Sequence, residues 1–174
     1  MLAAYALPAA AVWAVLGLAL TSLPIGTAAL LATVLYGALY GTAESFGLSR
    51  PRAPGRSWQV PQDFVIGAGS RRRALVWGSI LGPGFLTRNP YAGFGALLLL
   101  VAGVGGLASG LTVAALVGVA HGTGRALALL RDASSPQDDP FALLLRSLRW
   151  RALDGLALLA IAGAAAVTVA GRLG

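Results

Sequence analysis

The chain has 174 residues, of which 57% are apolar and 11% carry a charge. Soluble domains are about 45–50% apolar and about 25% charged, so this composition excludes an ordinary soluble fold and a disordered chain. The net charge is +7, every basic residue is arginine, and cysteine is absent, which excludes disulfides and thiolate metal sites made by this chain. We therefore expect an all-α, polytopic transmembrane helix bundle without cofactor or metal.

Residues 2–45 form one long apolar tract that is interrupted by Thr21-Ser22-Leu23-Pro24-Ile25-Gly26. The whole tract is too long for one crossing of a hydrocarbon core about 30 Å thick. Proline lacks an amide donor and glycine relaxes the backbone, so the interruption predicts a tight turn. We expect a helical hairpin with spans at 3–21 and 26–45.

Residues 46–73 form a basic loop, in which three prolines oppose a long helix and six arginines face one acidic residue, Asp63. The positive-inside rule places such a loop in the cytoplasm. We therefore predict a multi-pass protein of the bacterial cytoplasmic membrane, with this loop and the N-terminus on the cytoplasmic side.

Residues 74–104 are apolar but carry two sets of helix breakers, Gly82-Pro83-Gly84 and Pro90. Either one broken span or two short spans fit this pattern. Downstream, we predict spans at 107–130 and 152–171, joined by a second polar loop at 131–151.

The arginines discriminate between five and six crossings. If 74–104 crosses once, ten loop arginines are cytoplasmic and only Arg172 lies outside; if it crosses twice, seven lie inside and five outside. The positive-inside rule favours five crossings with a broken third span, and six crossings remain the alternative.

Within the second polar loop, residues 139–151 predict an interfacial amphipathic helix. Asp139 and Pro140 suit the start of a helix. Phe141, Leu144, Leu145 and Leu148 then recur at helical spacing. Trp150 would anchor this helix among the headgroups.

The break in 74–104 is the first candidate site. Non-helical backbone at membrane depth is tolerated where it lines protein or water, and helix N-termini at a gap attract anions. Arg88 and Asn89, between Gly82-Pro83-Gly84 and Pro90, would then contact a small polar or anionic solute. The competing interpretation is a surface turn with Arg88 among the headgroups.

Three further residues extend this candidate polar path. His121 and Arg125 are four residues apart and share one helix face within an apolar span, where ionisable groups are costly. A neutral packed histidine and an arginine reaching the headgroups are the simpler interpretation. Glu44, at the end of its span, pairs with Arg88 or Arg125 or, as we prefer, lies in the interface.

Two features predict partners other than a solute. Arg71, Arg72, Arg73, Arg146 and Arg149 lie beside apolar spans, where they contact anionic lipid headgroups rather than nucleic acid. The Gly-x-x-x-Gly pairs 106/110 and 118/122 allow close helix approach. We interpret them as packing within the chain, with self-association or a membrane-protein partner as the alternative.

No catalytic signature accompanies these features, and an enzyme is not expected. The sequence favours a small transporter, or a transporter component, for a small polar or anionic solute. The alternative is a non-catalytic accessory or assembly subunit of a membrane protein complex.

Overall fold

The computed structural model describes residues 2–48, 66–81, 92–134 and 140–174, and every regular element in these ranges is an α-helix. The all-α class is therefore confirmed for the described residues. Helices α1 (Leu2–Thr21) and α2 (Gly26–Ser45) agree with the predicted helical ranges to within one residue. Each has 20 residues and so a length of about 30 Å, the thickness of a hydrocarbon core.

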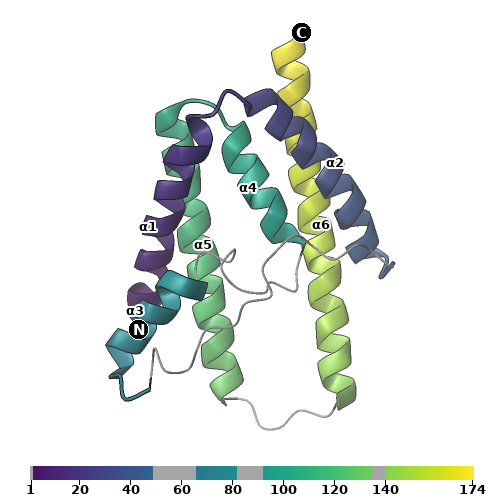
Figure 1. The fold of residues 1–174 in the computed structure, drawn as a ribbon. Helices are drawn as coiled ribbons and strands as arrows, with labels where there is room; N and C mark the ends of the chain where they lie inside the picture. The colour runs from purple at the N-terminus through teal and green to yellow at the C-terminus, as the bar shows by residue number, and fades with distance from the viewer. Residues whose placement is uncertain (1, 49–65, 82–91, 135–139) are drawn as a thin grey trace. The chain divides into compact units, whose positions relative to one another are not determined.

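The six helices belong to two compact units that alternate along the chain (Figure 1). The first unit (Met1–Ser22, Gly55–Asn89, Gly106–Ser135) contains α1, α3 (Ser70–Leu81) and α5 (Leu107–Ser134). The second unit (Leu23–Pro54, Pro90–Gly105, Pro136–Gly174) contains α2, α4 (Gly93–Gly103) and α6 (Pro140–Leu173). Each unit thus pairs two long helices with one short helix.

In the first unit, α1 and α5 run antiparallel and touch through small residues. The buried residues of α5 recur every fourth position, at Gly110, Ala114, Gly118, Gly122 and Ala126. A Cβ added at Gly118 would lie 2.6 Å from the Cα of Ala10, so only glycine permits this approach. The predicted packing within the chain is therefore confirmed for Gly110, Gly118 and Gly122, whereas nothing lies within 4 Å of a Cβ added at Gly106.

In the second unit, α2 and α6 also run antiparallel. The buried residues of α6 alternate in steps of three and four, which keeps one stripe of the helix against α2. A Cβ added at Gly41 of α2 would lie 2.9 Å from Leu159 of α6, so glycine again sets the separation of the helices. The buried stripe consists of Gly155, Leu158, Ala162, Ala165 and Val169.

Many large apolar side chains point outward on the long helices, while alanine and glycine occupy much of the interior beside a few large residues such as Trp13 and Leu30. Val15 of α1 is 66% exposed, Leu35 of α2 is 72% exposed and Val167 of α6 is 75% exposed. Such a surface would be unstable in water but matches lipid chains. Four helices contain apolar stretches long enough to cross a membrane: Ala3–Thr21, Gly26–Ser45, Leu107–Gly124 and Ser147–Leu173.

The region 74–104 forms two short helices rather than one continuous span. Helix α3 ends at Leu81 and α4 begins at Gly93, and the two belong to different units. With 12 and 11 residues, each helix is about 17–18 Å long, which is less than one crossing. The predicted break residues Gly82, Pro83, Gly84 and Pro90 lie outside the described residues.

The prediction of a separate interfacial helix at 139–151 is wrong. Helix α6 begins at Pro140, the favoured first position for proline, and continues without interruption to Leu173. No proline separates the amphipathic segment of α6 from its apolar segment. Gly155 lies between the two segments, but it stays helical and packs closely against α2. The amphipathic residues are therefore the first turns of a membrane-length helix.

Candidate functional site: a polar cluster around helix α4

The second unit contains a buried ion pair between its two long helices. Glu44, in the last turn of α2, has a fully buried side chain, and its Oε2 accepts a hydrogen bond from Nε of Arg151 at 2.6 Å. The Arg151 side chain is one-third exposed. Burying a carboxylate without a partner costs several kcal/mol or more, so the facing arginine is what makes this position tolerable.

The N-terminus of α4 lies against the same stretch of α6. The N-cap residue Ala92 has no side chain with which to cap the helix. Asp154, one turn after Arg151, supplies the missing acceptor, because its Oδ2 accepts a hydrogen bond from the Gly93 N–H at 3.1 Å. A carboxylate at this end also complements the positive pole of the helix dipole.

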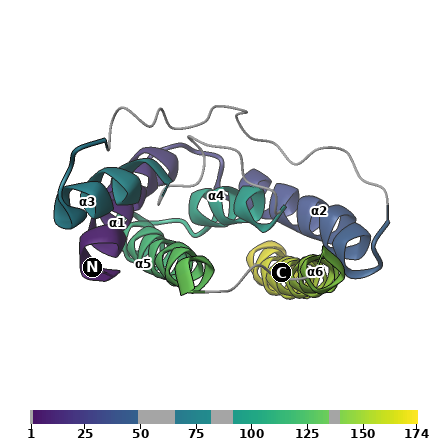
Figure 2. The same ribbon diagram turned by 90° about the horizontal axis from the view of Figure 1, so that it is seen from below.

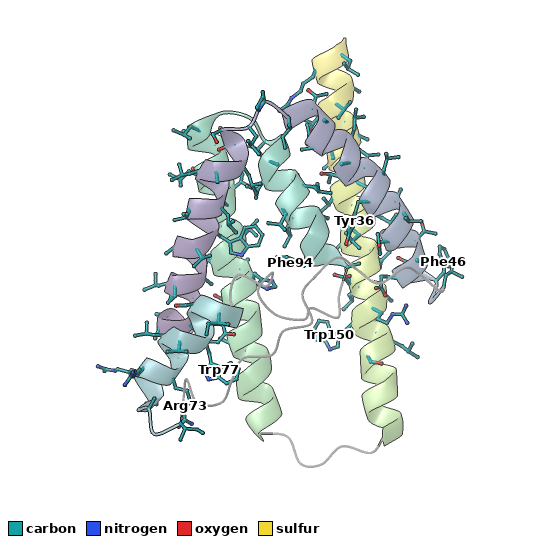
Figure 3. All side chains as sticks on the ribbon, in the orientation of Figure 1. Tyr36, Phe46, Arg73, Trp77, Phe94 and Trp150 are labelled. Carbon is teal, nitrogen blue, oxygen red and sulfur yellow. The ribbon has the colours of Figure 1, made fainter. Side chains whose placement is uncertain are left out.

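Tyrosines of α2 complete the surroundings of the first turn of α4. The Tyr36 hydroxyl donates a hydrogen bond to the Ala92 carbonyl at 2.8 Å, and a Cβ added at Gly95 would lie 2.7 Å from the Tyr36 ring (Figure 3). The Tyr36 and Tyr40 rings stack with centroids 4.4 Å apart. Ala92 also packs in a buried cluster with Tyr40 and Leu158, so α4 begins beside the second half of α2.

The other end of α4 is held by a second charged residue of α6. Nη2 of Arg172 donates to the carbonyls of Gly103 and Val104, at 3.1 Å each. A cation at the C-terminus complements the negative pole of the dipole. Two glycines with positive φ, Gly105 at 69° and Gly106 at 79°, then lead into α5, a backbone conformation that side-chain-bearing residues rarely adopt.

The structure places the predicted site residues in different parts of the chain. Glu44 has a buried side chain that pairs with Arg151. Its pairing with Arg88 or Arg125 and its place in the membrane interface stay predictions. His121 is half-buried on α5, three residues before the end of its apolar stretch. Arg125 also belongs to α5, and Arg88 and Asn89 lie outside the described residues. Glu44 and His121 belong to different units.

Sequence reasoning missed Asp154, Arg151 and Arg172 as parts of a site. In the sequence, Arg151 and Arg172 are only charges at the ends of a predicted span. Asp154 carried a usable signal, because it is the one acidic residue in the apolar segment 152–171. An ionisable residue at such a position is by default a candidate for function.

The cluster offers charge and hydrogen-bonding capacity rather than metal chemistry. Among the residues that the structure describes, no group of three or more histidine, aspartate or glutamate side chains could hold a metal ion. No protein family model matches the chain, and neither a curated protein nor a solved structure is similar to it.

Proposed function

We propose that the chain is an integral membrane transport protein, or the membrane component of a transporter, for a small polar solute. The half-length helix α4, which begins among charged and tyrosyl side chains of the second unit, is the observation that carries this proposal. Helices that stop within the bilayer expose backbone polar groups that need partners. Transporters use such broken helices where a solute has to meet polar groups at membrane depth.

The spacing of charges along α6 supports a site within the membrane thickness. Arg151 and Arg172 are 21 residues apart, which corresponds to about 31 Å of helix and thus to one hydrocarbon core. Asp154 lies about 4.5 Å inside the Arg151 end on the same scale. The two arginines then mark the membrane boundaries, and Asp154 and the start of α4 lie between them.

The charged groups around the start of α4 indicate what charge the solute could carry. Asp154 already accepts a hydrogen bond from the N-terminus of α4, where an anionic solute would bind. An anion would have to displace this carboxylate, so we propose a neutral or cationic polar solute ahead of an anionic one.

We also propose five crossings, with α3 and α4 together making the third. Thr21, at the end of α1, packs against Gly110, near the start of α5. Gly26, at the start of α2, lies near the carbonyl of Gly103, at the end of α4. These contacts favour a path in which α4 ends at the level of the α1–α2 turn, opposite the basic loop 46–73.

A charged, membrane-impermeant thiol reagent tests the transport proposal in membranes. Because the chain contains no cysteine, Arg88→Cys and His121→Cys each provide a single reactive position. The matched control is Leu116→Cys, whose side chain is 64% exposed on the outer surface of α5. A hydrated path predicts rapid labelling at 88 and 121 and none at 116. Equal protection at all three positions would contradict a polar path.

One observation favours the alternative role of an accessory subunit. Gly163 of α6 faces outward with nothing within 4 Å of an added Cβ, and the exposed Ala160 and Ala164 lie beside it. Such a surface allows another helix to approach closely. The glycines of α5 do not support this role, because they already pack against α1 within the chain. Recovery of a stable hetero-complex in mild detergent, without labelling at 88 and 121, would favour the accessory role.

A further inference from the structure

Helix α3 is anchored on the first turns of α1 by one narrow face. Ala74 is 7% exposed, and Gly78, one turn later, packs so closely that an added Cβ would lie 2.9 Å from the Cα of Tyr5. Figures 1 and 2 both show α3 beside the N-terminal end of α1. Since α1 is membrane-length, this contact places α3 at one end of a span rather than at its centre.

The rest of the α3 surface changes from charged to apolar along the helix. Arg71, Arg72 and Arg73 in the first turn are all exposed, and we call them the arginine turn. Trp77 and Ile80 follow Arg73 at spacings of four and three residues, so the three share one side of the helix. Arg73 is exposed, and Trp77 and Ile80 are half-buried. Figure 3 shows Arg73 and Trp77 on α3. From Arg73 to Ile80 the helix rises about 10 Å, comparable to the headgroup region of one leaflet.

Among the side chains that the structure describes, no carboxylate pairs with the arginine turn. The first turn of α3 contains no acidic residue, and Nη2 of Arg73 donates a hydrogen bond to the carbonyl of Ala68 at 3.3 Å. The carboxylates of Glu44 and Asp154 bind Arg151 and Gly93 in the other unit. Three cations at the N-terminal end of a helix also oppose its dipole, so an external anion would stabilise this arrangement.

We propose that α3 is a lipid-recognition helix, whose arginine turn binds the phosphates of anionic phospholipids while Trp77 and Ile80 enter the same leaflet. Guanidinium groups bind phosphate oxygens in a bidentate manner, and indole rings favour the level of the headgroups. The apolar side chains beyond the arginines favour a membrane surface over a soluble anion, because free phosphate has no apolar part that could contact them. The inference stands independently of the transport proposal.

Native mass spectrometry of the full chain in a neutral detergent provides the test. The protein is titrated with phosphatidylglycerol and, in parallel, with phosphatidylcholine, and bound lipids are counted. Arg71→Gln, Arg72→Gln and Arg73→Gln are combined in one variant. The matched control combines Arg50→Gln, Arg52→Gln and Arg56→Gln, which remove the same charge from the preceding loop.

We expect the α3 variant to bind phosphatidylglycerol on the order of 100-fold more weakly, since each basic residue near an anionic membrane contributes roughly a factor of five. Phosphatidylcholine binding should not change, and the loop control should resemble the natural chain. Equal losses in both variants would show a net-charge effect and overturn the site. Unchanged binding in the α3 variant, or full competition by millimolar inorganic phosphate, would overturn the lipid assignment.

A second measurement leaves the natural chain intact. Hydrogen exchange is followed in nanodiscs of phosphatidylcholine alone and of phosphatidylcholine with phosphatidylglycerol. We expect the amides of residues 70–77 to be protected at least several-fold by the anionic lipid, while those of α2 do not change. Identical exchange of α3 in both nanodiscs would contradict the proposal even if the arginine variants do not fold.

Discussion

Replacing Arg151 by methionine removes the cation that faces the buried carboxylate of Glu44. Methionine retains much of the aliphatic volume, so the main effect is electrostatic. The two groups approach to 2.6 Å, and the Glu44 side chain has no contact with solvent. Loss of one partner from a buried pair costs about 3–5 kcal/mol, because the other charge is left without compensation.

The partial exposure of Arg151 lowers the expected cost of losing the ion pair. One-third of its side chain contacts solvent, so part of the attraction is already screened. We therefore expect Arg151→Met to lower the free energy of unfolding by about 3 kcal/mol, or a melting temperature by about 6–12 °C for a chain of this size. Glu44→Gln should cost only about 1 kcal/mol, because the exposed arginine then turns toward water.

Thermal unfolding in detergent, followed by circular dichroism, measures these differences. The double variant should be more stable than the sum of the two single effects predicts, by roughly 1.5 kcal/mol or more, since both changes remove the same interaction. The matched control is Arg149→Met, which removes an exposed arginine from the same helix. Equal losses for Arg151→Met and Arg149→Met, or strict additivity in the double variant, would refute the ion pair as a source of stability.

Three further predictions concern glycines and the hydrogen bonds from Arg172 to the end of α4. Gly118→Val should cost about 1–3 kcal/mol in thermal unfolding, because its Cβ would meet the α1 backbone at 2.6 Å, whereas Gly124→Val, with open space around it, should be nearly neutral. Gly106→Ala should cost about 1–2 kcal/mol through its φ of 79° alone, while Gly69→Ala, with equal space and no positive φ, should not destabilise. Arg172→Ala should accelerate hydrogen exchange of the α4 amides by about five-fold, and unchanged exchange would show that its hydrogen bonds do not hold α4.

Those features of the fold that depend on local chemistry could be predicted from the sequence. The α1–α2 turn follows from Pro24 and the neighbouring glycine, and the start of α6 follows from the preference of proline for the first helical position. The outward leucines and inward glycines follow from the high apolar content, because lipid chains, unlike water, tolerate large apolar side chains at the surface. These inferences need only residues that are close in the sequence.

The polar cluster could not be predicted in the same way, because its partners are far apart in the sequence. Glu44 and Arg151 are separated by 107 residues, and Gly93 and Asp154 by 61. Hydrophobic periodicity determines which face of a helix is buried but not the helix that covers it. The continuity of α6 was missed for a related reason: its charged first turns resemble a surface helix until the packing of α2 against Gly155 is known.

Single-cysteine labelling in sealed vesicles of both orientations tests the central claim most directly, because the chain contains no cysteine of its own. The positions are Asp63→Cys in the first basic loop, Gln137→Cys between α5 and α6, and Ser22→Cys in the α1–α2 turn. A membrane protein with five crossings predicts that positions 63 and 137 react from the same face and that position 22 reacts from the other. Reaction of 63 and 137 from opposite faces would contradict the five crossings, and equal reaction of all three from either face would contradict insertion in the membrane.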